Sequence, residues 1–272
     1  MEKQNSQTTK AARKTGGLNA IVTIIILVVI GQLIYHLILG TSTNFEGGDP
    51  VKGSPLNFMG IIHKGGIIVP ILIALLLCVI VFSIERLFVL VKAQGSGNVA
   101  KFVSQVRTLL DRNDINEAIS LCEKQKGSIG NVVKEGLTTY KALESDTVMD
   151  KDQKLIELNK SLEEATTLEM PMLEKSMTIL ATIASVGTLI ALMGTVIGMI
   201  KAFFALGQGG GAPDAAALSV GISEALVNTA LGIGTSACAI ILYNTFTSMI
   251  DSLTFKIDEV GMSIQQSFAA YH

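Results

Sequence analysis

The chain has 272 residues, of which 49% are apolar and only 16% charged, and its mean hydropathy is +0.51. These values lie well outside those of average soluble proteins, so composition alone predicts a membrane protein. The net charge of −2 comes without a dense basic patch, which argues against a nucleic-acid partner.

The sequence offers little for a metal site, a disulfide or catalysis. Its cysteines and histidines are few and scattered, at Cys78, Cys122, Cys238, His36, His63 and His272. No metal-ligand or disulfide spacing occurs among them, so we expect free, buried thiols and no metal or other cofactor. The glycine-rich stretch 207–211 lacks the Lys-Ser/Thr pair and the strand–loop–helix setting of a phosphate-binding loop. We therefore predict that the chain is not an enzyme.

The chain begins with a polar segment, residues 1–17, that carries four Lys or Arg residues. An uncharged run rich in Ile and Val follows at residues 18–39. A basic start before an apolar run also describes a cleaved signal peptide. The run is long, however, and no A-x-A pattern precedes Thr41, so we expect a retained transmembrane helix.

A connector rich in Gly, Pro and Asn follows at residues 40–66, and a second apolar run covers residues 67–91. Pro70 suits the first turn of the second helix better than its middle, where it would remove a backbone hydrogen bond. The adjacent Glu85 and Arg86, near the end of this run, are expected to form an ion pair at the membrane interface.

Residues 92–175 are polar and predict a helical domain. An amphipathic helix is expected at 99–110, a second beginning near Asn113, and a third at 129–143. Apolar residues at three-four spacing then predict a helix that runs into Ser176 and is bent at Pro171. They are Leu155, Leu158, Leu162, Ala165 and Met172. A matching set in the C-terminal segment 250–272 predicts the partner side of a heptad-like seam: Ile250, Leu253, Ile257, Val260, Ile264 and Phe268.

Two further membrane helices are predicted at 176–206 and 217–249, joined by a glycine-rich turn at 207–216. Residues 176–200 contain no charged side chain in 25 positions, and residues 225–250 contain none in 26. Each run is long enough for a helix to cross a hydrocarbon core about 30 Å thick. The two runs therefore predict a membrane helical hairpin.

Small and hydroxyl residues share one face of each hairpin helix, at about 100° per residue. On the first helix they are Ala181, Ala184, Thr188, Ala191, Thr195, Gly198 and Ala202, and on the second Ala225, Thr229, Gly232 and Ser236. Small residues let membrane helices approach closely, so helix packing explains the alanines and glycines. A threonine hydroxyl can bond a backbone carbonyl one turn back, so the threonines alone do not predict a pore.

The distribution of Lys and Arg predicts the topology. The 1–17 tail has four, the 40–66 connector two, the 92–175 segment twelve, and the 207–216 turn none. Positive charge near helix ends favours the cytoplasmic side. We therefore expect four membrane helices with both termini cytoplasmic.

The amino-acid sequence of the hairpin resembles the ExbB/TolQ/MotA proton-channel family, and is closest to ExbB. The resemblance covers about a quarter of the chain. It is carried by Gly194-Thr195-Val196, Gly198-Met199, Ala202-Phe203, Gly221-Ile222, Glu224-Ala225-Leu226, Thr229-Ala230, Gly232 and Tyr243-Asn244. Gly187-Thr188 departs from the Ala-Pro of many relatives, and helix bending there can differ. The implied fold is an all-α integral membrane protein with the family's three transmembrane helices, one extra N-terminal transmembrane helix, and long helices extending into a cytoplasmic helical domain.

The resemblance also implies a proton pathway. Thr195 and Thr229 match the family's pore threonines, and Glu224 matches a glutamate implicated in lining the pore. Thr188 and Ser236 are further pathway candidates, while Gly194, Gly198, Ala191, Ala225 and Gly232 are expected to pack the helices. Glu224 is alternatively a plain helix-start acid, and on an ideal helix it lies about 140° from Thr229, which would place it between neighbouring subunits. Lys201 is expected simply to extend toward the membrane surface.

The implied function is that of a subunit of an inner-membrane motor driven by the proton-motive force. The implied partners are further copies of the chain, most simply a homopentamer, lipid, an ExbD-like single-helix protein with an intramembrane Asp, and a TonB-like transducer serving nutrient uptake. The chain has no intramembrane Asp of its own. A TolQ-like envelope-maintenance motor and a passive scaffold or transporter are the alternatives, although a transporter should show repeated halves.

Overall fold

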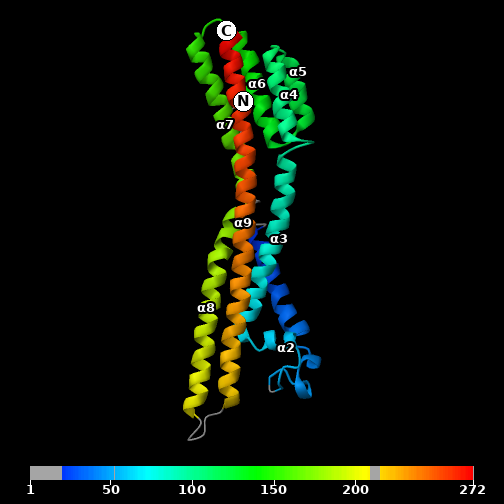
Figure 1. Ribbon diagram of the computed structural model, residues 1–272, viewed down its shortest axis with the longest axis vertical. Helices are drawn as coiled ribbons and strands as arrows, with labels where there is room; N and C mark the ends of the chain where they lie inside the picture. The colour runs from blue at the N-terminus through cyan, green and yellow to red at the C-terminus, as the bar shows by residue number, and fades with distance from the viewer. Residues whose placement is uncertain (1–19, 52, 209–214, 272) are drawn as a thin grey trace. The chain divides into compact units, whose positions relative to one another are not determined.

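The computed structural model describes residues 20–51, 53–208 and 215–271, and these form an all-α protein (Figure 1). Within these residues, four helices are long and apolar enough to cross a membrane: Ala20–Leu39, Gly66–Ala93, Met177–Phe204 and Leu218–Tyr271. The predicted fold class is confirmed. The 1–17 tail and most of the 207–216 turn lie outside the described residues.

The chain divides into two compact units. The first contains residues 1–83 and 178–243, and the second contains residues 84–177 and 244–272. Helices α3 (Val69–Ala93) and α9 (Ala215–Tyr271) contribute residues to both units. The first unit holds most of the apolar helices, including α8 (Met177–Gln208), and the second holds the polar ones.

In the first unit, the connector folds onto the end of the first helix, whose last residues, Ile34–Leu39 (η1), form a π-helix. The side-chain amide of Asn44 donates to two carbonyls at the end of that helix, at 2.9 and 3.0 Å. Asn57 donates to Asn44 at 2.9 Å and also caps the short helix α2 (Phe58–His63). The His63 ring stacks on Tyr35, with ring centroids 4.4 Å apart, and the Tyr35 hydroxyl donates to the His63 carbonyl.

Short 3₁₀ turns lie on either side of α2: η2 (Ser42–Asn44), η3 (Glu46–Gly48) and η4 (Gly66–Ile68). Pro70 falls in the first turn of α3, as predicted. The first helix packs closely against this turn, because a Cβ at Gly31 would lie 2.9 Å from the Pro70 carbonyl oxygen. The described residues of the connector, 40–51 and 53–66, are held against the end of the first helix by the contacts of Asn44 and His63.

The second unit contains the four expected polar helices: α4 (Val99–Asp111), α5 (Ile115–Gln125), α6 (Gly127–Glu144) and α7 (Lys151–Glu174). Helix α5 begins where predicted, and the side chain of Asp114 caps it by accepting from the Glu117 backbone N–H. Helix α7 begins with a capping box between Asp150 and Gln153. Side-chain oxygens at these positions satisfy backbone N–H groups that a helix start leaves unpaired.

The C-terminal seam residues of α9, Ile250, Leu253, Ile257, Val260, Ile264 and Phe268, are all buried, so this periodicity prediction is confirmed. The Phe268 ring meets Tyr140 of α6 edge to face, with centroids 4.8 Å apart. On α7 the prediction holds for Leu158 and Leu162 but is wrong near the helix end. There Leu173 is fully buried and Met172 is 46% exposed. The difference in burial arises because Arg86 bonds to the backbone at Met172 and Leu173, so this part of α7 faces α3.

The predicted helix does not run on into Ser176. Helix α7 ends at Glu174, Lys175 and Ser176 form a turn in which Ser176 has a φ of +65°, and α8 begins at Met177. A positive φ is uncommon for a residue other than glycine, so this joint needs support from its surroundings.

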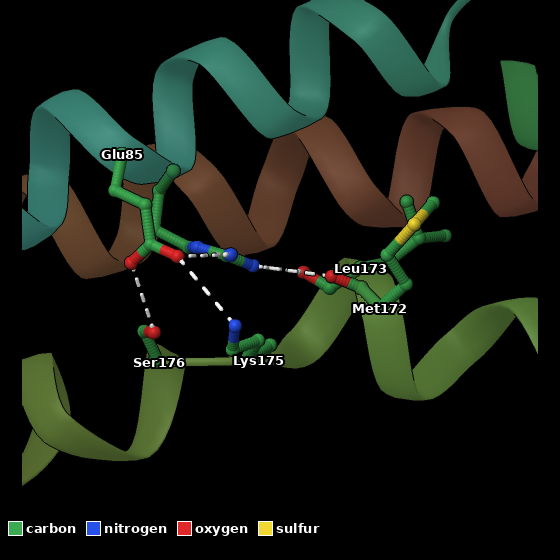
Figure 2. A network of polar contacts seen from close by, with 6 residues as sticks. Glu85, Met172, Leu173, Lys175 and Ser176 are labelled. Atoms are coloured by element: carbon green, nitrogen blue, oxygen red, sulfur yellow. Dashed lines mark hydrogen bonds and ion pairs between the residues drawn. The ribbon is translucent and has the colours of Figure 1, made fainter. Parts of the chain in front are cut away.

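Arg86 of α3 supplies that support (Figure 2). It is 1% exposed, and its Nη1 donates to the carbonyls of Met172 and Leu173 at 3.2 and 3.3 Å. These are terminal carbonyls that α7 leaves unpaired. The expected ion pair with Glu85 is present at 3.3 Å, and the second oxygen of Glu85 accepts a hydrogen bond from the Ser176 hydroxyl at 3.1 Å. Glu85 and Arg86 thus hold the α7–α8 joint.

We expect Arg86→Met to destabilise the second unit by about 2–3 kcal/mol, because buried carbonyls lose a charged donor. Thermal unfolding of the full chain in mild detergent measures this loss. Lys175→Met is the matched control: Lys175 lies 3.9 Å from the same carboxylate but is 48% exposed, so its change should stay within about 0.5 kcal/mol. Equal shifts for the two variants would contradict this role of Arg86.

Candidate functional site

Helices α8 and α9 touch through their smallest residues. A Cβ added to Gly232 would overlap that of Ala191, and it would lie 2.9 Å from the Gly187 carbonyl oxygen. A Cβ at Gly198 would lie 2.9 Å from the Ala225 nitrogen. The structure therefore places Ala191, Gly198, Ala225 and Gly232 where the two backbones approach most closely, an arrangement typical of membrane helix pairs.

Gly194 makes room for a polar side chain that the periodicity did not single out. The atoms of Asn228 that face it would lie 2.7–2.9 Å from a Cβ at this position. Asn228 is fully buried, and its Nδ2 donates to the carbonyl of Gly65 at 2.9 Å. Its Oδ1 has no hydrogen-bond partner among the described residues.

Glu224 is paired within its own chain. Lys201 Nζ donates to Glu224 Oε1 at 2.6 Å, and the Glu224 side chain is 7% exposed whereas that of Lys201 is 52% exposed. The expectation that Lys201 extends toward the membrane surface did not include this ion pair with a buried carboxylate on the other helix of the hairpin. Gly66, with a φ of +78°, lies against the same carboxylate, and a Cβ there would overlap it.

The four hydroxyl candidates have partners of two kinds. The Thr188 hydroxyl donates to the Ser236 hydroxyl at 3.0 Å and so joins α8 to α9. Thr195 donates to the Leu192 carbonyl at 2.6 Å, and Thr229 donates to the Ala225 carbonyl at 2.9 Å. Both threonine side chains are half-buried. Each retains oxygen lone pairs that can accept a hydrogen bond.

Thr195 opens onto a shallow apolar groove. The described residues that line it all belong to α8: Thr195, Val196, Met199, Ile200, Phe203 and Phe204. Thr229 is not among them, so within one chain the groove does not join the two threonines. Across the described part of the chain, no three His, Cys, Asp or Glu side chains come together as possible metal ligands.

Comparison with known proteins identifies the class of protein. Residues 124–259, half of the chain, match the model of the MotA/TolQ/ExbB proton channel family. The chain belongs to this family. The match includes α8 and most of α9, with every pathway candidate named above, and the first helix and the connector lie outside it.

The family's individual members match at modest identity. A Synechocystis protein named biopolymer transport protein ExbB-like 3 is 32% identical over 117 residues, 43% of this chain and 56% of its own length. Biopolymer transport protein ExbB of Xanthomonas campestris is 34% identical over 113 residues, 41% of this chain and 44% of its own. Tol-Pal system protein TolQ of Haemophilus influenzae is 29% identical over 207 residues, 73% of this chain and 87% of its own. The matched stretch thus spans about half the length of the first two relatives.

The close contact between α8 and α9 predicts opposite outcomes for two neighbouring glycines. Gly232→Ala should destabilise the pair by about 1–3 kcal/mol, because the added methyl group overlaps Ala191. Gly234→Ala is the matched control, since apart from the backbone of its own helix no described residue lies within 4 Å of the added Cβ, and it should be neutral or slightly stabilising. Unfolding of the full chain in detergent compares them, and equal stability of the two variants would contradict the contact.

Proposed function

We propose that this chain is an ExbB-like subunit of an inner-membrane motor that uses the proton-motive force to energise a TonB-like transducer for nutrient uptake across the outer membrane. Family membership and four apolar helices support a proton-channel subunit. The ExbB-named relatives, at 32% and 34% identity, favour this system. A TolQ-like role is the second candidate, because the TolQ match extends over more of the chain.

One observation carries the proposal. Glu224 is the only carboxylate in residues 178–208 and 215–243, and it is buried in an ion pair with Lys201. The hydroxyls of Thr195 and Thr229 interrupt apolar helix surfaces without adding charge. Such a hairpin can hydrate a proton path, but the group that gains and loses the proton has to come from another molecule. A partner with one transmembrane helix and an intramembrane Asp, like ExbD, would supply it.

We further propose an arrangement for the complex. Five copies would surround the partner's helices, since a closed ring gives every copy the same interface. The 40–66 connector and 207–216 turn would face the periplasm, and the 92–175 domain, the 250–272 tail and both termini would be cytoplasmic. The lysine and arginine counts favour this orientation.

Within the hairpin, we assign Thr195 and Thr229 to the proton path. Thr188 and Ser236 bond to each other between the helices, which suits them to fasten the hairpin. Glu224 is held by a side chain of its own subunit, which suits it to a similar role.

The Thr195→Val/Thr229→Val variant tests this proposal. Valine keeps the shape of threonine but lacks the hydroxyl, and a dry apolar constriction cannot solvate a moving proton. The variant should form the ring and bind its partner, yet energy-dependent uptake across the outer membrane should fail. Serine at both positions keeps the hydroxyls and should be milder.

Thr235→Val is the matched control for the loss of a hydroxyl. Thr235 also lies on α9 and donates to a carbonyl one turn back, at 2.8 Å, but it is only 2% exposed and so cannot line a pore. Its variant should support normal uptake. Normal uptake by the double valine variant, at normal expression, would remove the hydroxyls from the mechanism.

A further inference from the structure

Three segments of the first unit meet at the Glu224 carboxylate. Lys201 reaches it from α8, Glu224 itself belongs to α9, and Gly66 of the connector lies directly against it. The contact with Gly66 depends on a residue without a side chain, both because of its φ of +78° and because a Cβ would overlap the carboxylate.

A second attachment lies one helical turn further along α9. There the buried amide of Asn228 donates to the Gly65 carbonyl at 2.9 Å. Residues four apart on a helix share a face, so Glu224 and Asn228 lie side by side against two consecutive residues of the connector: Glu224 in contact with Gly66, and Asn228 hydrogen-bonded to Gly65. We call Lys201, Glu224, Gly65, Gly66 and Asn228 the connector latch.

The two charges of the latch differ in exposure. The Glu224 side chain is 7% exposed, and Lys201 is its only ion-pair partner among the described residues, so without Lys201 the carboxylate would be buried and unpaired there. The Lys201 side chain is 52% exposed, so without Glu224 it can turn to water or the membrane surface. Removing one member of a buried pair is costly because the other is left uncompensated, whereas replacing both by neutral groups is often tolerated.

We propose that Lys201 is a positioning residue that holds Glu224 as a fixed ion pair beneath Gly65 and Gly66. Glu224 then fastens the connector to the α8–α9 hairpin and does not carry the transported proton. The fastening follows from the contacts of this chain. The exclusion of Glu224 from proton transfer rests, in addition, on the function proposed above.

Four variants of the full chain test the latch: Lys201→Met, Glu224→Gln, the two combined, and Lys201→Arg. The readout is hydrogen exchange at the amides of Lys64 and Gly65, which donate to carbonyls within the connector. Lys201→Met should speed exchange about tenfold or more, because it leaves the buried Glu224 carboxylate without its ion-pair partner. Glu224→Gln should have a smaller effect, because its amide oxygen can still accept from Lys201.

Variants that leave no unpaired buried charge distinguish an ion pair from ordinary packing, because only an ion pair predicts that they restore the exchange rate. The double variant and Lys201→Arg should both return exchange to within about threefold of the wild-type rate, because no unpaired buried charge remains. The latch is overturned if Glu224→Gln speeds exchange more than Lys201→Met does. It is also overturned if the double variant exchanges as fast as Lys201→Met.

The exposed pair of Lys134 and Glu123 is the matched control. Lys134 Nζ and Glu123 Oε1 are 2.7 Å apart, a distance similar to that between Lys201 and Glu224. However, the side chains of Lys134 and Glu123 are 46% and 57% exposed. Lys134→Met and Glu123→Gln should each leave melting and exchange unchanged, because exposed pairs contribute little.

Nutrient uptake tests the second half of the proposal. The double variant, with the connector restored, should support uptake within about threefold of the wild-type rate, because neither charge carries the proton. Loss of uptake by a double variant that exchanges normally would assign the proton to Glu224 and overturn the exclusion. If the wild-type chain itself fails to support uptake, the proposed function is wrong, and so is the exclusion of Glu224 from proton transfer. The exchange rates would still test whether Lys201 and Glu224 fasten the connector.

Discussion

The close contact between α8 and α9 is the constraint on which the rest of the first unit depends. In lipid there is no hydrophobic force to bring two apolar helices together, so the pair relies on backbone approach at small residues. Gly232 and Ala191 provide that approach, and Gly194 leaves the space that Asn228 fills. Because Asn228 then donates to the Gly65 carbonyl and Glu224 lies against Gly66, the packing of the two helices also places the connector against the hairpin.

The same contact determines what the hairpin can do with protons. The polar groups predicted to lie on the pathway have partners within the chain: Thr188 bonds to Ser236, Glu224 to Lys201, and the hydroxyls of Thr195 and Thr229 to backbone carbonyls of their own helices. Polar groups in a membrane need such partners, since lipid offers none. In the described hairpin these groups are already engaged within the chain, and the proposed function assigns the titrating group to a partner.

Sequence reasoning predicted what depends on local pattern. The apolar runs predicted the membrane helices, and the spacing of Leu253, Ile257 and Val260 predicted the buried seam of α9. It missed what depends on residues distant in the chain. The break at Ser176 is held by Arg86, and no periodicity within either segment could predict that contact. The pairing of Lys201 with Glu224 was missed for a similar reason, since it crosses the turn between the two helices.

The central claim is that this chain provides the path and another molecule provides the titrating group. Proton flux into vesicles that enclose a pH-sensitive dye tests it most directly, with the purified chain reconstituted alone or together with a single-helix partner bearing an intramembrane Asp. The account predicts flux with the partner, and none above empty vesicles with the chain alone or with the partner's Asp replaced by Asn. Flux through the chain alone, abolished by Glu224→Gln, would contradict it.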